Sequence, residues 1–397
     1  MSKMASILLT GLAIIVVAGI GFWVWLGPQW RSFLSNPPSD TDVLFWEQSQ
    51  RDTGFALGEK IPTVKSLPIQ SAGNPRVLDI AEGLAQSDEI AAFMRAQNAA
   101  GLVILRDGKI VFEGYGLHQT KTSKWASFSV AKSMTSTLVG AAITDGHIDG
   151  LEAPISDYIT AFQGTAYDGV TVQQLLTMTS GVDWNEDYDD PNSDVALFRA
   201  VDIEPGEAST VTYMKRLGRA HSPGDVFNYS TGETNLVGNL VEAATGKPLN
   251  AYLSEKIWGP YGMHGDAAWI TASTGEPIGG CCIQASTRDY ALFGQFVLDG
   301  GMIDGASIVP EGWFEAATSL QERVPDDDKR DYGFQWWILE DGSFAALGIF
   351  GQAIYVDRPQ NIVMAINASW DDAEGVAAGQ SDSRHAFWFQ LRDWLVK

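Results

Sequence analysis

The sequence predicts a two-lobed α/β fold of the α+β kind, with an antiparallel sheet flanked by helices and a mainly helical insert as second lobe. Two apolar runs, 101–105 and 110–116, flank Asp107-Gly108, a dipeptide that favours a tight hairpin turn. Further apolar runs typical of strands lie at 334–339, 344–347, 352–356 and 362–368. The intervening stretch, about 147–270, has the pattern of helices and turns. We therefore expect one sheet built from both ends of the domain, with a cleft beside the insert.

The chain begins with an apolar segment, Ala5–Leu26, which is long enough to cross a bilayer as a helix. We expect residues 1–27 to be an N-terminal transmembrane anchor; the alternative is a cleaved signal peptide. Residues 28–85 contain scattered prolines and are expected to be a connector of short extended pieces that packs on the domain. The folded domain is expected over 86–397. Under both interpretations of the N-terminal segment we expect the domain to be exported. An anchor would hold it in the cell envelope on the periplasmic side, and a cleaved signal peptide would leave it secreted.

The composition excludes several classes of partner and cofactor. A formal charge of −23 over 397 residues argues against nucleic acid as a partner. The five histidines have no metal-ligand spacing, so we expect no metal and no other cofactor. The only two cysteines are neighbours, Cys281 and Cys282, and we expect them to be small buried residues without a useful disulfide.

A short stretch ending in Ser129-Val130-Ala131-Lys132 precedes an apolar segment that ends at Gly146. This pattern predicts a buried helix that begins near Ser129, and residues three apart share a helix face. A desolvated lysine has a lowered pKa and can take the proton of a neighbouring serine. The helix start also supplies free N–H groups for a developing oxyanion. The alternative is a capping serine followed by a surface lysine.

Two later segments add candidate residues. Tyr229 lies in a Gly-bounded loop about a hundred residues after Ser129, where a tyrosine hydroxyl near Lys132 could relay a proton; ordinary packing is the alternative. Gly351 and Gln352 open a predicted strand, and a glycine there permits close approach of a substrate, although a β-bulge is an equal explanation.

The Ser129–Lys132 motif, the Tyr229 loop and the Gly351 strand resemble, in order and spacing, the serine β-lactamase and penicillin-binding protein superfamily. The resemblance covers roughly 90–397 and is greatest to the class C-type branch that includes family VIII-type esterases and 6-aminohexanoate-dimer hydrolases. It implies that Ser129 is the nucleophile, Lys132 the general base and Tyr229 the proton relay. It also implies an oxyanion hole formed by the backbone N–H groups of Ser129 and Gln352.

The same resemblance suggests substrate-binding residues. Tyr188 and Trp184 lie on the loop that caps the cleft in the 6-aminohexanoate-dimer (nylon oligomer) hydrolases. Phe350 and Gly351 lie on the strand beside the cleft. Two positions depart from the superfamily. Thr231 stands where β-lactamases have the Asn of Tyr-x-Asn, and Ile349-Phe350-Gly351 replaces Lys-Thr-Gly. The missing lysine would meet a substrate carboxylate, so its loss favours neutral esters or amides.

We therefore expect a serine hydrolase that cleaves carboxylic esters or linear amides through an acyl-enzyme. One alternative is a β-lactamase or D-Ala-D-Ala peptidase that acts on cell-wall-type substrates, and another is an inactive envelope protein that only binds. The expected partners are a small-molecule substrate and, through the N-terminal helix only, a membrane. The sequence indicates no oligomeric state.

Overall fold

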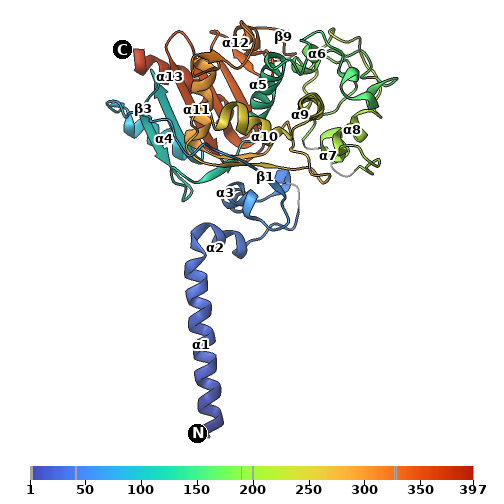
Figure 1. Cartoon of the computed structure of the whole chain (residues 1–397). Coiled ribbons are helices and arrows are strands. Elements are labelled where there is room, and N and C mark those ends of the chain that lie inside the picture. The colour runs from blue at the N-terminus through green and yellow to red at the C-terminus, as the bar shows by residue number, and fades with distance from the viewer. Residues whose placement is uncertain are drawn as a thin grey trace.

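The computed structural model describes residues 3–40, 43–188, 190–198, 201–325, 327 and 329–396. Its centre is an eight-stranded antiparallel sheet in the order β3-β2-β14-β13-β12-β11-β10-β9. The hairpin β2–β3 (Ala99–Arg106, Lys109–Tyr115) pairs directly with β14 (Ile362–Ala368), so both ends of the domain share one sheet. This confirms the predicted fold class (Figure 1).

The remaining elements have these bounds. The other strands of the large sheet are β9 (Glu322–Arg323), β10 (Arg330–Tyr332), β11 (Trp337–Leu339), β12 (Phe344–Gly348) and β13 (Gln352–Asp357). The smaller sheets contain β1 (Ser66–Ile69), β5 (Ala267–Ile270), β6 (Ile283–Ser286) and β4 (Lys124–Ala126), and the pair β7 (Met302–Ile303) and β8 (Ala306–Ser307). The α-helices are α1 (Lys3–Trp25), α2 (Gly27–Ser35), α3 (Gln48–Leu57), α4 (Ser87–Ala96), α5 (Val130–Thr144), α6 (Val172–Leu176), α7 (Asp194–Leu197), α8 (Ser209–Met214), α9 (Thr231–Thr245), α10 (Leu249–Leu253), α11 (Thr287–Leu298), α12 (Trp313–Ala317) and α13 (Gln380–Val396).

The large sheet buries both of its faces, because alternate residues of each strand point to opposite sides. On β2, Val103 and Leu105 join the core that contains α5 and α11. Leu102 and Ile104 join a second core with α4 and α13. This layering fixes α5, and with it Ser129, against the sheet at the junction with the helical lobe (Figure 1).

The N-terminal part of the chain differs from the expected connector. Residues 28–85 form helices α2 and α3 as well as the extended strand β1, which pairs with β5. Phe55 of α3 is 2% exposed and packs on the domain. In Figure 1, α1 projects away from the domain and α2 and α3 lie between the two.

Within the described residues, no one helix combines the length and the apolarity that a bilayer crossing needs. The helical segments 10–25 and 27–35 meet both criteria only as a pair, and they are bent by 109° at their junction.

Helix α4 begins at Ser87, and Ile80 ahead of it forms a β-bridge with Ile110. Two local expectations were wrong. The strand expected from Phe334 begins at Trp337, because Gly333–Trp336 closes a turn with Gln335 at φ 64°. Cys281 and Cys282 form a disulfide with each other and are half-buried rather than buried. Since the two are neighbours, this bond closes no long loop and constrains the unfolded chain little.

Candidate active site

Ser129 lies at the N-cap of α5, directly after strand β4 and a strained residue. Phe128 has φ 43°, which non-glycine residues rarely adopt, and such strain clusters at functional sites. The turn fits closely beside β12, since a Cβ on Gly348 would lie 2.9 Å from the carbonyl oxygen of Ser127. The local fold therefore holds the serine at the edge of the sheet, half-buried.

Lys132 is 2% exposed and one turn along the same helix. Its Nζ donates to Ser129 Oγ (3.3 Å), Thr231 Oγ1 (2.9 Å) and the carbonyl oxygen of Gly280 (3.0 Å). Burial lowers the pKa of Lys132 to about 8, while the negative charge of Glu186 opposes that change. The surface-lysine alternative is thus wrong, and an appreciable fraction of the amine is neutral near pH 7 to 8.

Tyr229 lies next to the lysine, with Nζ of Lys132 5.3 Å from the centre of its ring. Burial raises the pKa of Tyr229, as does the charge of Glu186, whereas a hydrogen bond with Ser129 acts in the opposite direction. Its ring stacks on Trp337, with centroids 5.6 Å apart. The structure therefore brings Ser129, Lys132 and Tyr229 into one cluster, with the tyrosine as a neutral phenol that can donate a proton.

Glu186 is a site residue that the sequence reasoning missed. It accepts hydrogen bonds from the backbone N–H of Thr231 (2.9 Å) and from the hydroxyl of Tyr188 (2.8 Å). It also accepts from Thr231 Oγ1 and from the indole N–H of Trp184. Thr231, in the place of the superfamily's Asn, links Lys132 to this carboxylate, and it begins α9, whose N-terminus favours a negative charge. The signal available was the pair of acidic residues, Glu186 and Asp187, between Trp184 and Tyr188.

Buried hydrogen bonds hold the segment around Gln352, which is predicted to contribute a backbone N–H to the oxyanion hole. Gln352 begins β13, and its side-chain amide donates to the carbonyl oxygens of Ile349, Phe350 and Ala368. Gly351 has φ 91°, and a Cβ there would lie 2.5 Å from Trp370 Nε1. The glycine is therefore required by packing and by backbone conformation.

The predicted substrate-binding residues separate into two groups. Tyr188 lines a cavity of about 640 Å³ together with Ser129 and Thr231. Trp184 is instead buried in the helical lobe against Phe198 and Tyr213, and it reaches the site only through Glu186. Phe350 and Gly351 are buried behind the cavity wall rather than in it.

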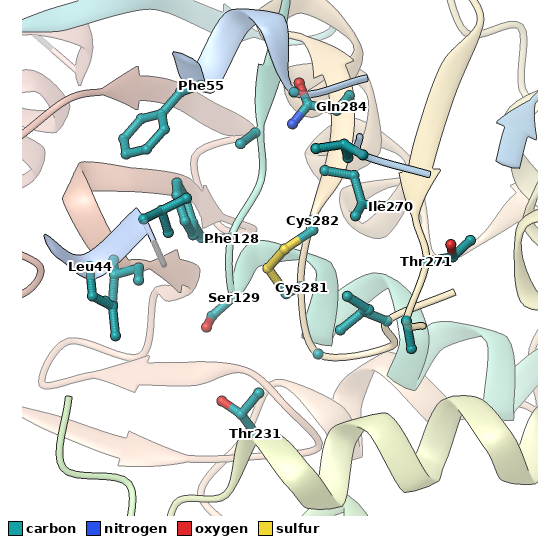
Figure 2. A pocket seen from close by; sticks show the side chains of 18 of the residues that line it. Leu44, Phe55, Phe128, Ser129, Thr231, Ile270, Thr271, Cys281, Cys282 and Gln284 are labelled. Atoms are coloured by element: carbon teal, nitrogen blue, oxygen red, sulfur yellow. A yellow bond between two sulfur atoms is a disulfide. The ribbon is translucent and has the colours of Figure 1, made fainter. Parts of the chain in front are cut away.

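Figure 2 shows Ser129 at the edge of this cavity, with the Cys281–Cys282 disulfide beside it and Thr231 opposite. Gly280, next to the disulfide, approaches Lys132 so closely that a Cβ would lie 3.2 Å from Nζ. In the part of the chain that the structure describes, no group of three or more His, Cys, Asp or Glu residues could hold a metal ion.

A buried lysine beside a serine at a helix start, between an antiparallel sheet and a helical lobe, is the arrangement of a serine hydrolase. The model of the beta-lactamase family matches residues 87–386. The 6-aminohexanoate-dimer hydrolase of Paenarthrobacter ureafaciens is 30% identical over 311 residues, covering 74% of this chain and 76% of that protein. The chain belongs to the beta-lactamase family.

Solved structures agree on the fold. A putative 6-aminohexanoate-dimer hydrolase from Bacillus anthracis superposes with a TM-score of 0.74 at 22% identity, covering 87% of this chain and 95% of that one. EstCE1, a hydrolase with promiscuous acyltransferase activity, gives a TM-score of 0.61 at 14% identity, with coverage of 78% and 99%. At these identities the likeness concerns the fold alone.

Proposed function

We propose that this protein hydrolyses carboxylic esters or linear amides through an acyl-enzyme on Ser129. Ser129 Oγ attacks the substrate carbonyl carbon and passes its proton to neutral Lys132. Tyr229 donates a proton to the leaving oxygen or nitrogen as its bond to the acyl carbon breaks, and Lys132 passes the serine's proton to Tyr229, so that both groups are neutral again. Water then attacks the acyl-enzyme and gives a proton to this pair, which returns it to Ser129 Oγ as the acid leaves. The backbone N–H groups of Ser129 and Gln352 are proposed to bind the oxyanion.

The observation that carries this proposal is the buried Lys132, 3.3 Å from Ser129 Oγ and with a pKa lowered to about 8. A general base works best when its pKa is near the operating pH. A purely structural lysine in a buried site would be paired directly with a carboxylate. Here the nearest carboxylate, on Glu186, is reached only through the hydroxyl of Thr231.

The strand beside the site supports neutral substrates. Phe350 occupies the segment where β-lactamases have Lys-Thr-Gly, and it is buried against Phe55 and Phe128. No arginine or lysine is among the described residues that line the cavity. A substrate carboxylate would therefore be desolvated there without a cation, which is costly. Esters and linear amides are favoured over β-lactams and D-Ala-D-Ala peptides on this ground. The named substrate of the Paenarthrobacter relative, a linear amide dimer, agrees with this class.

Acyl-enzyme trapping tests the proposal. The protein, its Ser129→Ala variant and a control variant of an exposed serine, Ser319→Ala, are each incubated with p-nitrophenyl acetate, a fluorophosphonate probe and nitrocefin. We expect ester turnover and a covalent adduct on Ser129 in the parent and in Ser319→Ala, and neither in Ser129→Ala. Nitrocefin turnover at a comparable rate would favour the β-lactamase alternative. Equal ester rates in all three proteins without an adduct would favour the binding protein.

We further propose that the N-terminal segment anchors the domain to a membrane, with the domain on the periplasmic side. Exposed apolar side chains along α1, including Ile14 (65%) and Val17 (69%), support this location because water would otherwise contact them. Carbonate extraction of the native cell fraction, together with sequencing of the mature N-terminus, tests it. Recovery in the soluble fraction with an intact N-terminus would contradict an anchor, and an N-terminus inside the apolar segment would indicate a cleaved signal peptide.

A further inference from the structure

The cavity at Ser129 has one wall made by the N-terminal connector. Side chains from α2, α3 and the turn between them, Phe33, Leu44 and Phe55, line it together with Phe128 beside the serine. On the opposite side it is lined by Ile270 and by the Cys281–Cys282 disulfide (Figure 2). The volume of about 640 Å³ lies in the range of about 300–1,000 Å³ typical of sites for organic ligands.

This wall is anchored to the domain. Phe55 packs edge-on against Phe128, with ring centroids 4.8 Å apart, and against Trp125 at 5.8 Å. The side chain of Arg51 on α3 donates to the backbone carbonyl of Asp371 (2.8 Å). Gln48 at the start of the same helix donates to the carbonyl of Ser369 (2.7 Å). The cavity is therefore a fixed feature of the fold, and its apolar lining gains from any apolar group that displaces water.

The position of the cavity relative to the reacting groups decides which half of a substrate it receives. Tyr229, the proposed donor to the leaving group, is not among the described residues that line it, whereas Ser129 is. The leaving group must lie on the side of Tyr229. The part of the substrate that stays on the serine then extends toward Leu44 and Phe128.

We infer that the cavity binds the acyl chain of the substrate, and that this chain is a long aliphatic one. The inference rests on the proposed acyl-enzyme reaction at Ser129. The connector wall supplies a binding surface that Ser129, Lys132 and Tyr229 alone do not, and it selects among esters by the length of their acyl group. A chain on the alcohol side would not contact the connector wall.

Two series of esters test this assignment on the full chain in dilute detergent. In the first, p-nitrophenyl acetate, butyrate, hexanoate and octanoate vary the acyl chain. In the second, acetates of ethanol, butanol, hexanol and octanol vary the leaving group. We expect kcat/KM to rise about twofold to fourfold for each methylene added to the acyl chain, the gain expected for burying that group. It should stay nearly constant along the alcohol series.

Cavity-filling variants locate the effect. Leu44→Trp and, from the opposite wall, Ile270→Trp should reduce the ratio of octanoate to acetate kcat/KM by tenfold or more. Leu34→Trp makes the same change on α2 at a residue that is exposed and outside the cavity lining, and it should keep the parent ratio. Thermal unfolding of each variant identifies a folding defect, and Ile270→Trp serves where Leu44→Trp fails to fold.

The outcomes separate this inference from the proposed function. Ester cleavage that needs Ser129 but is flat or falls with acyl length, or a chain-length dependence that neither tryptophan variant alters, overturns the acyl-chain assignment alone. A steeper dependence on the alcohol than on the acyl chain overturns it as well. Absence of turnover for every ester, with no adduct on Ser129, overturns the proposed function itself.

Discussion

Glu186→Gln removes the charge of a carboxylate that opposes the lowered pKa of Lys132. The carboxylate stabilises the ammonium form of the lysine, so its loss favours the neutral amine and the pKa of Lys132 falls below about 8. The proposed mechanism needs the neutral amine. The acid limb of the kcat/KM profile, with its midpoint near pH 8 in the parent, should therefore move to lower pH in the variant.

The expected size of this change follows from the hydrogen-bond chain. Lys132 Nζ lies 2.9 Å from Thr231 Oγ1, which in turn donates to Glu186. Two hydrogen bonds of about 2.9 Å each keep the charges within about 6 Å. At an effective dielectric constant of about 20, unit charges at that distance attract by about 3 kcal/mol. That energy corresponds to about two pKa units, and solvent at the half-buried Glu186 reduces the expected shift to about one to two units.

The assay is the pH dependence of kcat/KM for one p-nitrophenyl ester, corrected for its spontaneous hydrolysis. Asp187→Asn is the matched control, because it removes the same charge from an exposed neighbour on the same loop. Asp187→Asn should keep the pH profile of the parent. Glu186→Gln should have a lower maximal kcat/KM at high pH, but should retain a larger fraction of that maximum below pH 7. An acid limb that stays in place or moves to higher pH in Glu186→Gln would refute the electrostatic link through Thr231.

Two further changes test the packing around the site. Gly351→Ala places a methyl group at φ 91° and 2.5 Å from Trp370, so we expect a loss of about 2–5 kcal/mol of unfolding free energy in chemical denaturation. The control Gly342→Ala, with φ 84° and open space around it, should lose only about 1–2 kcal/mol. Equal losses in the two variants would contradict the role of the contact with Trp370. Glu233 is buried and its pKa is raised to about 8 in the folded protein against 4.5 unfolded, so its contribution to stability is complete below about pH 4.5 and is lost as pH rises through 8. Glu233→Gln should remove up to about 4 kcal/mol of this pH dependence between about pH 5 and pH 9, and an unchanged dependence would show that another group titrates.

The fold and the central cluster could be predicted because their signals are local. Asp107-Gly108 fits a primed turn by residue type alone, and both residues have positive φ in the structure. The serine and lysine of Ser129-x-x-Lys132 share a helix face by spacing, so their proximity follows from the helix. The strands β12, β13 and β14 lie close to the apolar runs at 344–347, 352–356 and 362–368, whereas the run at 334–339 contributes only Trp337–Leu339.

Other features depend on contacts between distant segments. Nothing in the spacing of Glu186 and Thr231, 45 residues apart, indicates that a carboxylate would accept from the first residue of α9. Trp184 was expected at the substrate, yet its indole faces the core of the helical lobe and only its N–H reaches Glu186. The connector, too, carries too few apolar residues in a regular period to predict α3 as a wall of the site. These features depend on tertiary contacts between distant segments, which local propensity does not determine.

The two departures from the superfamily pattern act on opposite sides of Lys132. On one side, the hydroxyl of Thr231 accepts a hydrogen bond from Lys132 and donates one to Glu186. The carboxylate of the helical lobe therefore interacts with the amine through Thr231 and makes no direct contact with it. On the other, Ile349 stands in place of the lysine; it is half-buried, lines the cavity and packs against the cluster of Phe55, Phe128 and Phe350. An ammonium group on residue 349 would lie against these aromatic rings, where desolvation is costly. The loss of the cation and the packing of α3 therefore act in the same direction, and together they turn a region suited to a substrate carboxylate into one suited to an apolar acyl group.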